Sequence, residues 1–245
     1  MTAYEPRRYR RLPGAADLVA CEVAVGETDL MVLAVRDLRV EARAAARAAR
    51  RQIESHLALH PETLEARRPL PTPPDAHGVV AAMYDAARVA ATGPMAAVAG
   101  AVAEVVARAL AEHSPEVVVE NGGDLFLITA RERVVGIDAG GPPWGHSLAV
   151  AVPAGERAVC TSSGTVGHSA SGGRADSAVV VAPSGALADA LATAVANRVR
   201  GPDDVAAAVE WARAHGGIEH VVIICGETMG AWGALELRRM TDRTD

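Results

Sequence analysis

The fold of this chain is decided by the stretch VVVENGGDLFLIT, which occupies residues 117–129 of 245. Apolar residues favour a strand on each side of the central Asn-Gly-Gly-Asp. Asn-Gly is the strongest short signal for a hairpin, because both central residues of a type I′ turn need positive φ. A second interpretation of Asn121, Gly122, Gly123 and Asp124 stays open: the glycines let backbone N–H groups approach a phosphate, with Asp124 as a polar anchor.

Outward from this stretch, strand-like and helix-like runs follow one another without a fixed period. Hairpins and helices that do not alternate regularly are typical of an α+β protein, which is the fold class that we predict. The expected strands are 18–25, 30–35, 117–120, 125–129, 134–138, 147–152, 158–162, 177–182, 218–225 and 231–237. The expected helices are 39–60, 79–91, 95–112, 186–198 and 203–215.

Prolines concentrate in the segment 61–76, which contains five of them. A domain boundary at this segment would leave about 60 residues on its N-terminal side, which is marginal for an independent domain. We therefore expect one domain over 1–245, with a long Pro-rich loop at 61–76.

The composition restricts the classes of function. Half of the residues are hydrophobic, 3% are aromatic, the formal net charge is −6, and every Lys or Arg is an arginine. An acidic chain is not expected to bind nucleic acid, because phosphate neutralisation needs a cationic surface. No uninterrupted apolar run reaches the roughly eighteen residues of a membrane span. With three scattered cysteines and no apolar segment behind the first arginines, we expect a reducing, cytoplasmic location.

The most unusual stretch is TSSGTVGHS, which begins at Thr161 and holds five hydroxyls in nine residues. Such a loop offers many donors to an anion, so Thr161, Ser162, Ser163 and Gly164 are candidate phosphate-binding residues, and His168 is a candidate general acid or base. A serine nucleophile activated by His168 is an alternative, although no Gly-x-Ser-x-Gly elbow supports it. A polar surface loop is the third interpretation.

Two residue pairs have the spacing of metal ligands on a helix. Asp189 and Thr193 are four residues apart, so a carboxylate and a hydroxyl share one helix face, and such hard oxygens suit Mg²⁺. The alternative is that Asp189 only stabilises the helix dipole from the first turn. His56 and His60 are also four apart, a spacing that zinc sites use, but the sequence shows no third ligand.

Three stretches, in this order, resemble the ApbE-like superfamily: ENGGD at 120–124, CTSSG at 160–164 and ADALATA at 188–194. Upstream segments, among them GPMAAVAG at 93–100, look like those of a shorter branch of the superfamily. The resemblance covers about 9–237. It implies an ApbE-like fold, in which mixed, mostly antiparallel sheets are packed with helices.

The best-known members of that superfamily are flavin transferases, which use Mg²⁺ and FAD to attach FMN to a Thr or Ser of a partner protein. The resemblance implies that Asp189 and Thr193 bind Mg²⁺, with a main-chain carbonyl near Val98 as a further ligand and Asp189 as a catalytic residue. It implies that the 121–124 turn and the 161–164 loop bind FAD or a related nucleotide. An acceptor protein and a second copy of the chain are further expected partners.

The chain departs from the transferase pattern at several positions. Ala99 stands where the transferases have a lysine, Thr165 stands where they have an aspartate, and RADS at 174–177 replaces their His-Ile-Ile-Asp-Pro segment. A bound isoalloxazine would have few aromatic partners, and Trp144 and Phe126 are the nearest candidates by sequence.

These departures leave two alternatives to a flavin transferase. One is a divergent enzyme that acts on another small molecule, with His168 as acid or base and Ser162, Ser163 or Cys160 nearby. The other is a module that binds a flavin or nucleotide without catalysis.

Overall fold

The computed structural model describes residues 15–141, 143–145, 147–164 and 172–240, which include eleven strands in two sheets. The strands are β1 Val19–Val25, β2 Thr28–Ala34, β3 Val117–Asn121, β4 Asp124–Thr129, β5 Arg133–Ile137, β6 Leu148–Val152, β7 Gly155–Ser162, β8 Ser177–Ala182, β9 His220–Cys225, β10 Thr228–Gly233 and β11 Leu237–Arg239. The large sheet has the order β1-β2-β3-β4-β7-β8-β9-β10 and the small one β11-β6-β5. Every neighbouring pair of described strands is antiparallel.

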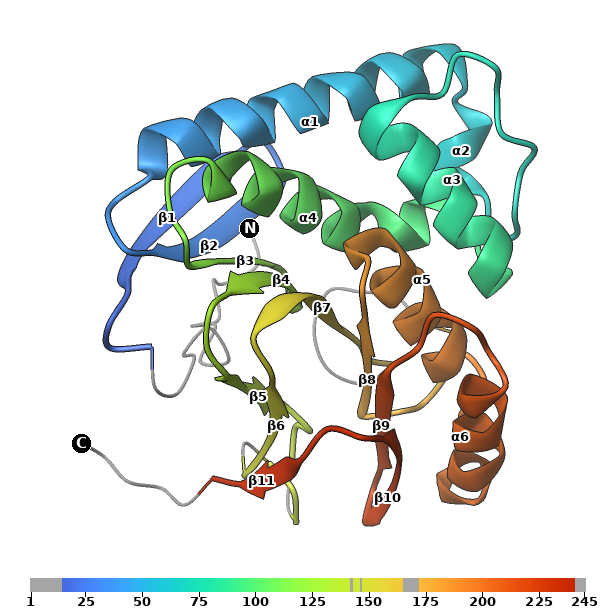
Figure 1. Cartoon of the computed structure of the whole chain (residues 1–245). Helices are drawn as coiled ribbons and strands as arrows, with labels where there is room; N and C mark the ends of the chain where they lie inside the picture. Colours follow the sequence, from blue (N-terminus) through green and yellow to red (C-terminus); the bar gives the residue numbers. More distant parts are fainter. Residues whose placement is uncertain (1–14, 142, 146, 165–171, 241–245) are drawn as a thin grey trace.

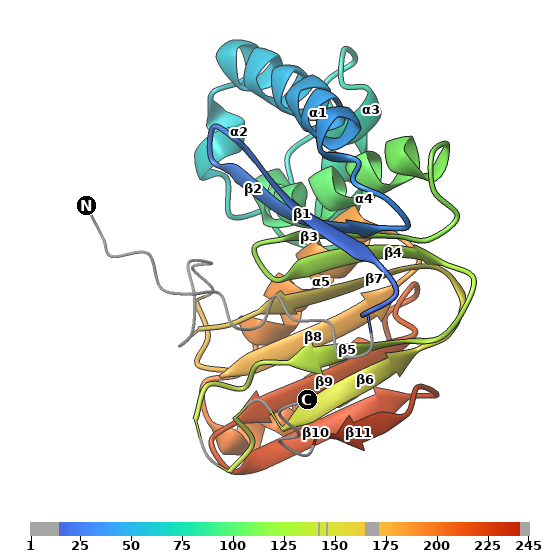
Figure 2. The same cartoon turned by 90° about the vertical axis from the view of Figure 1, so that its left-hand side faces the viewer.

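Helices cover one face of the large sheet and the small sheet covers part of the other, as Figures 1 and 2 show. The helices are α1 Arg39–Leu59, α2 Glu62–Glu65, α3 Gly78–Ala90, α4 Val98–Ala111, α5 Gly185–Ala196 and α6 Val205–Arg213. α1 packs on β1 and β2, α4 on β3 and β4, α5 on β7 and β8, and α6 on β9 and β10. The predicted α+β class with antiparallel sheets is confirmed.

The central strands are apolar along their whole length because both of their faces are buried. Val117 and Val119 of β3 belong to the core under the helices, whereas Val118 belongs to the core under the small sheet. In β4, Phe126 faces the helices and Leu127 faces the small sheet. Successive side chains of a strand point to opposite faces, so two cores require a continuous apolar run.

Element boundaries differ from the sequence prediction mainly near the C-terminal end. One strand was expected at 231–237, but β10 begins at Thr228 and a separate strand begins at Leu237. Gly226 has a φ of +59° in a tight turn between β9 and β10, where Cys225 pairs with Thr228. Because of this turn, β10 begins three residues before the expected strand, and Met229 pairs with Ile224 of β9. The Pro-rich segment 61–76 also contains the short helix α2.

The segment Pro94–Ala111, which ends in α4, is long and apolar enough to cross a membrane by composition. Half of it is buried inside the protein, and α4 contacts α1, α5, β3 and β4. These contacts are those of a core helix under a sheet, where an apolar helix surface is expected.

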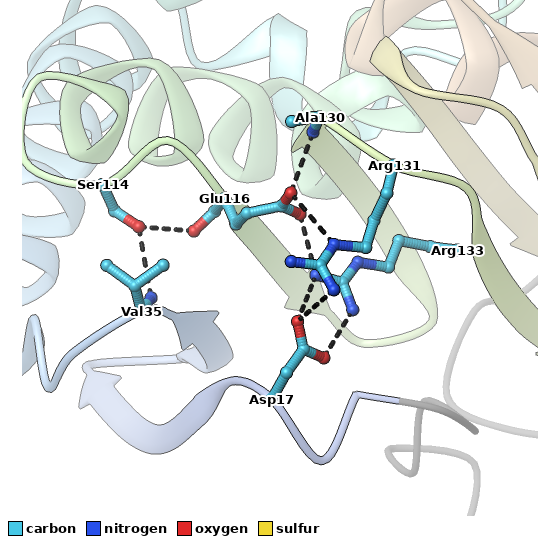
Figure 3. A network of polar contacts seen from close by, with 7 residues as sticks. All are labelled: Asp17, Val35, Ser114, Glu116, Ala130, Arg131 and Arg133. Carbon is cyan, nitrogen blue, oxygen red and sulfur yellow. Dashed lines mark hydrogen bonds and ion pairs between the residues drawn. The ribbon is translucent and has the colours of Figure 1, made fainter.

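A polar network fastens the segment before β1 to β3 and β5 (Figure 3). The guanidinium of Arg133, whose side chain is 3% exposed, donates to Asp17 Oδ1 at 2.7 Å and to Glu116 Oε2 at 2.8 Å. The hydrogen bond from Arg133 lowers the pKa of Asp17 to about 2. Glu116 also accepts from the backbone N–H of Ala130 at 3.0 Å. The network therefore joins three segments that are distant in the sequence.

Candidate active site

Three hydrogen bonds bring together the stretches that carry the sequence resemblance. Asn121 Nδ2, at the end of β3, donates to the carbonyl oxygen of Ala99 at 3.0 Å. The backbone N–H of Thr161 donates to Asp124 Oδ1 at 3.2 Å. Asp189 Oδ2 on α5 accepts from the backbone N–H of Gly100 on α4 at 2.9 Å. The β3–β4 turn, the end of β7 and the beginnings of α4 and α5 therefore form one site.

The turn from Asn121 to Asp124 has the geometry that its sequence predicts. Gly122 and Gly123 have φ of +68° and +106°, and Asn121 pairs with Asp124 across the hairpin. The N–H of Gly123 donates to Glu120 Oε1 at 2.7 Å. A Cβ at either glycine would meet nothing within 4 Å, so the turn is open on its outer side. The hairpin interpretation is confirmed, and binding of a nucleotide by this turn stays a prediction.

Asp124 is 6% exposed and Asp189 is partly exposed, and the protein around each carboxyl group disfavours its charged form. Burial raises the pKa of Asp189 to about 7, although the N–H groups of Gly100 and Ala99 oppose the shift. Burial also raises the pKa of Asp124 well above its usual range, and the charges of Asp189 and Glu120 add to that shift. A cation bound near these groups would favour their charged forms.

Cys160 lies against these carboxylates but lacks the properties of a nucleophile. It is fully buried in β7, and its Sγ donates to the carbonyl oxygen of Gly185 at 3.7 Å. Burial and the nearby charges of Asp124 and Asp189 raise the pKa of its thiol well above the usual value. Since the thiolate is the reactive form, Cys160 acts as a packed core residue.

The donor atoms of this site fit Mg²⁺, which prefers hard oxygen ligands and retains several waters. Asp124 and Asp189 supply carboxylates, and Thr193 lies one turn after Asp189 on the same face of α5, with both side chains partly exposed. A main-chain carbonyl near Val98 is the third expected ligand. In this part of the chain, the backbone group that contacts Asp189 is the N–H of Gly100. Mg²⁺ binding by Asp189, Thr193 and a carbonyl near Val98 stays a prediction.

The site depends on a close contact between α4 and α5, and the sequence did not show which residues make this contact. A Cβ at Gly100 would overlap the carbonyl oxygen of Gly185 and lie 2.8 Å from the Cβ of Asp189. Glu104 Oε2 accepts from the N–H of Gly185 at 2.7 Å and from the hydroxyl of Ser184 at 3.2 Å. Ser184 is the N-cap residue of α5. The only sequence signal for Gly100 was the run of small residues in this helix, and Glu104 had none.

The remaining predicted residues have different outcomes. Ser162 and Ser163 are 3% and 7% exposed, and the Ser162 hydroxyl has no hydrogen-bond partner within the described part of the chain. The Gly164 N–H donates to the carbonyl oxygen of Ala175 at 2.9 Å, which joins the end of β7 to the segment before β8. His168 lies outside the described residues.

The expectation for Phe126 is wrong. Its side chain is fully buried in the core, under the guanidinium of Arg108 at 5.1 Å from the ring centroid. An isoalloxazine cannot stack on a ring that has no exposed face. The alternation of the strand decided this position, because Phe126 faces the helices and not the solvent.

The helix-covered antiparallel sheet, with Asp189 at the α4–α5 contact and Asp124 at the start of β4, is the fold of the ApbE-like superfamily, to which the chain belongs. A family model described as "AbpE bacteria" matches residues 10–230, and the chain belongs to this family. It is 43% identical over 172 residues to a UPF0280 protein of Methanothermobacter thermautotrophicus, which covers 67% of each chain. It is 37% identical over 200 residues to a UPF0280 protein of Methanococcus aeolicus, which covers 79% of this chain and 81% of the relative.

Two solved structures show the same fold. The apo flavinyl transferase ApbE of Pseudomonas stutzeri matches with a TM-score of 0.50 and 15% identity, over 88% of this chain and 93% of that protein. The apbe protein of Thermotoga maritima matches with a TM-score of 0.53 and 15% identity, over 89% and 96%. At such low identity the likeness establishes the architecture, and residue roles have to be argued from this chain itself.

Proposed function

We propose that this protein is a cytoplasmic, Mg²⁺-dependent enzyme that binds FAD or a related nucleotide and cleaves or transfers at its pyrophosphate. Two features support the proposal: the fold shared with proteins named flavin transferases, and the neighbouring carboxyl groups of Asp124 and Asp189 with their raised pKa values. The second feature carries the proposal, because carboxyl groups with raised pKa values either keep a proton or bind a cation, and a bound Mg²⁺ would also attract phosphate.

Asp189 and Thr193 would hold Mg²⁺, which when bound would supply positive charge against the negative charge that develops as the phosphoanhydride breaks. The protein's own groups would orient the reactants. Gly100 fixes one carboxylate oxygen of Asp189, and the N–H of Thr161 fixes one of Asp124. Fixed carboxylates hold a metal without reorganising during the reaction, which lowers the barrier.

The N–H groups of the open turn at Gly122 and Gly123 and the hydroxyls of Thr161, Ser162 and Ser163 are proposed to bind the nucleotide. Attack by a hydroxyl on the FMN phosphorus would break its bond to the bridging oxygen, which leaves with AMP, and would join FMN to the acceptor as the hydroxyl proton passes to solvent. The acceptor is proposed to be a Ser or Thr of a partner protein, with water as the alternative acceptor in a simple hydrolase. We also propose that the enzyme acts without nucleic acid or membrane and as a homodimer.

The buried thiol of Cys160 favours this proposal over a thiol-based enzyme, since its high pKa leaves it protonated. Ala99 remains the main departure from the transferases. It is partly exposed at the start of α4 beside Gly100, so its position belongs to the site although it offers no charge. Substrate orientation therefore has to come from the Mg²⁺ and the backbone donors.

The experiment is a measurement of AMP release from FAD, with and without Mg²⁺, for the wild type and for Asp189→Asn. The substitution keeps the shape and an acceptor for the Gly100 N–H but removes the negative charge. We expect Mg²⁺-dependent turnover to fall by at least about 100-fold, as for the loss of a metal-binding group. FAD binding measured separately by equilibrium dialysis distinguishes an enzyme from a binding module.

Asp85→Asn is the matched control, because Asp85 is an exposed residue on α3 whose charged partner is Arg88 at 3.6 Å. It should retain wild-type turnover. Unchanged Mg²⁺-dependent turnover in Asp189→Asn contradicts the proposed role of Asp189. Tight FAD binding without turnover at any Mg²⁺ concentration contradicts the enzymatic proposal and identifies a binding module.

A further inference from the structure

A second cluster of metal-binding groups lies at the C-terminal end of α1, in elements that the proposed flavin site does not use. His56, His60 and Asp75 each place one ligand atom within 4.8 Å of the others. Figure 1 shows this end of α1 beside α2 and α3. The sequence supplied only the two histidines, and the Pro-rich segment brings Asp75 to them from 15 residues further along the chain.

His56 is held in one orientation by residues behind it. It is 8% exposed, and its Nε2 contacts the hydroxyls of Tyr84 at 3.0 Å and Thr63 at 3.4 Å. Among the described residues no hydrogen bond reaches its other nitrogen, Nδ1. Metal-binding histidines are commonly fixed in this way, with one nitrogen on a second residue and the other free for the metal.

His60 differs from His56 in that both of its nitrogens lie near carboxylate oxygens. Its Nδ1 is 3.6 Å from Glu62 Oε1, and its Nε2 is 3.4 Å from Asp75 Oδ1. The rings of His56 and His60 are stacked with centroids 4.6 Å apart. An ion pair between His60 and Asp75 would explain the contact between His60 Nε2 and Asp75 Oδ1. It would not explain why Nδ1 of the neighbouring His56 accepts or donates no hydrogen bond among the described residues.

The cluster opens into a cavity of about 560 Å³ that both His56 and Asp75 line. Arg51 and Gln52 of α1 and His77, which precedes α3, also line the cavity. A metal at the cluster would therefore keep a coordination position that faces the cavity. The positive charge of Arg51 favours water-derived hydroxide or another anion in that position.

We propose that His56, His60 and Asp75 form a site for Zn²⁺, with three protein ligands and a fourth position open to the cavity. Two imidazoles and one carboxylate are the ligand set of zinc sites that keep an open position, whereas Mg²⁺ and Ca²⁺ select oxygen ligands. Zinc bonds of about 2.0–2.2 Å require the three ligand atoms to close to about 3.5 Å. The side chains of His60 and Asp75 are 25% and 52% exposed, so both are free to turn toward the ion.

The test is Zn²⁺ binding to the untagged protein after dialysis against a chelator, measured by calorimetry and by metal analysis of the dialysed complex. The tag is omitted because polyhistidine itself binds zinc. We expect one Zn²⁺ per chain in the wild type and affinity reduced by at least about 100-fold in His60→Gln and in Asp75→Asn. Co²⁺ in place of Zn²⁺ should give the visible absorption of a four-coordinate ion in the wild type and lose it in both variants.

The controls are His215→Gln and Asp85→Asn, which remove a histidine and an aspartate of other elements. His215 Nδ1 contacts the carbonyl oxygen of Trp211 at 3.0 Å, so its main contact is local. Both controls should bind Zn²⁺ as the wild type does. His56 is not used as a test because its buried contacts would confuse folding with binding.

Absence of stoichiometric Zn²⁺ binding to the wild type overturns the proposal. Wild-type affinity in both His60→Gln and Asp75→Asn also overturns it. If Zn²⁺ binding survives these variants and disappears in Asp189→Asn, the ion occupies the aspartate pair of the candidate active site instead. The zinc proposal does not depend on the flavin-nucleotide function, so the two can fail separately.

Discussion

Replacing Gly100 with alanine tests whether the contact between α4 and α5 holds the candidate active site in place. The added methyl group would overlap the carbonyl oxygen of Gly185 and lie 2.8 Å from the Cβ of Asp189. Real Cβ atoms essentially never come closer than 3.0 Å to a non-bonded heavy atom. The obstacle on the α5 side is backbone, which cannot turn away as a flexible side chain would, so α5 has to move by about 1 Å.

Two opposing contributions set the size of the effect. Alanine is the better helix former by about 1 kcal/mol, which by itself would stabilise α4. Insertion of a methyl group into a tightly packed contact costs about 1–3 kcal/mol, and the rigid backbone on the α5 side favours the upper end. We expect the free energy of unfolding to fall by about 2 kcal/mol. For a chain of this size the Tm should fall by about 4–8 °C.

Chemical denaturation of wild type and Gly100→Ala measures the change in stability, and calorimetric titration measures the affinity for Mg²⁺. We expect weaker Mg²⁺ binding by at least about tenfold, because Asp189 moves with α5. Gly216→Ala is the matched control, since a Cβ at Gly216 meets nothing within 4 Å. Equal or higher stability of Gly100→Ala, together with wild-type Mg²⁺ affinity, would refute the inferred role of this contact.

Two further predictions concern the network around Arg133. Arg133→Met should lower the free energy of unfolding by about 3–5 kcal/mol, because it leaves the 6% exposed carboxylate of Glu116 without its main charged partner. Urea denaturation measures this change. A loss below about 1 kcal/mol contradicts the prediction. The pKa of Asp17 falls from 3.8 to about 2 on folding, so its stabilising contribution is complete above pH 3.8 and is lost as the pH falls toward 2. The stability difference between wild type and Asp17→Asn, measured by denaturation between about pH 5 and about pH 2, should therefore shrink as the pH falls, and a constant difference would disprove the assignment.

Much of the fold was predictable because the signals are local. The positive φ of Gly122 and Gly123 follows from the Asn-Gly-Gly-Asp turn, and the hairpin of β1 and β2 follows from two apolar runs around Gly26. The end of the chain was harder to predict. The residues 231–237 form parts of two strands, because β10 pairs from Thr228 onward and β11 joins the other sheet.

The face of each strand residue could not be assigned from sequence, because both faces of the central strands are buried. Val119 lies in the core under the helices and Val118 in the core under the small sheet. Because both are apolar, the sequence shows no alternation of polarity that would indicate which core each residue enters. Phe126 was misjudged as a stacking candidate for the same reason. Glu116 and Arg133 likewise gave no sequence signal of their pairing, since their contact exists only where β3 and β5 come together with Asp17.

The sequence by itself determined the α+β class, the glycine turn and the candidate aspartate on its helix, since periodicity and turn chemistry act over a few residues. Only the tertiary structure decided what these groups contact. Asp189 meets the N–H of Gly100 from 89 residues away, and Asp75 completes the histidine pair by the path of a Pro-rich segment. Such contacts between distant residues depend on how the helices pack and on the paths of the loops. The free energy that stabilises these contacts comes from packing of the whole core.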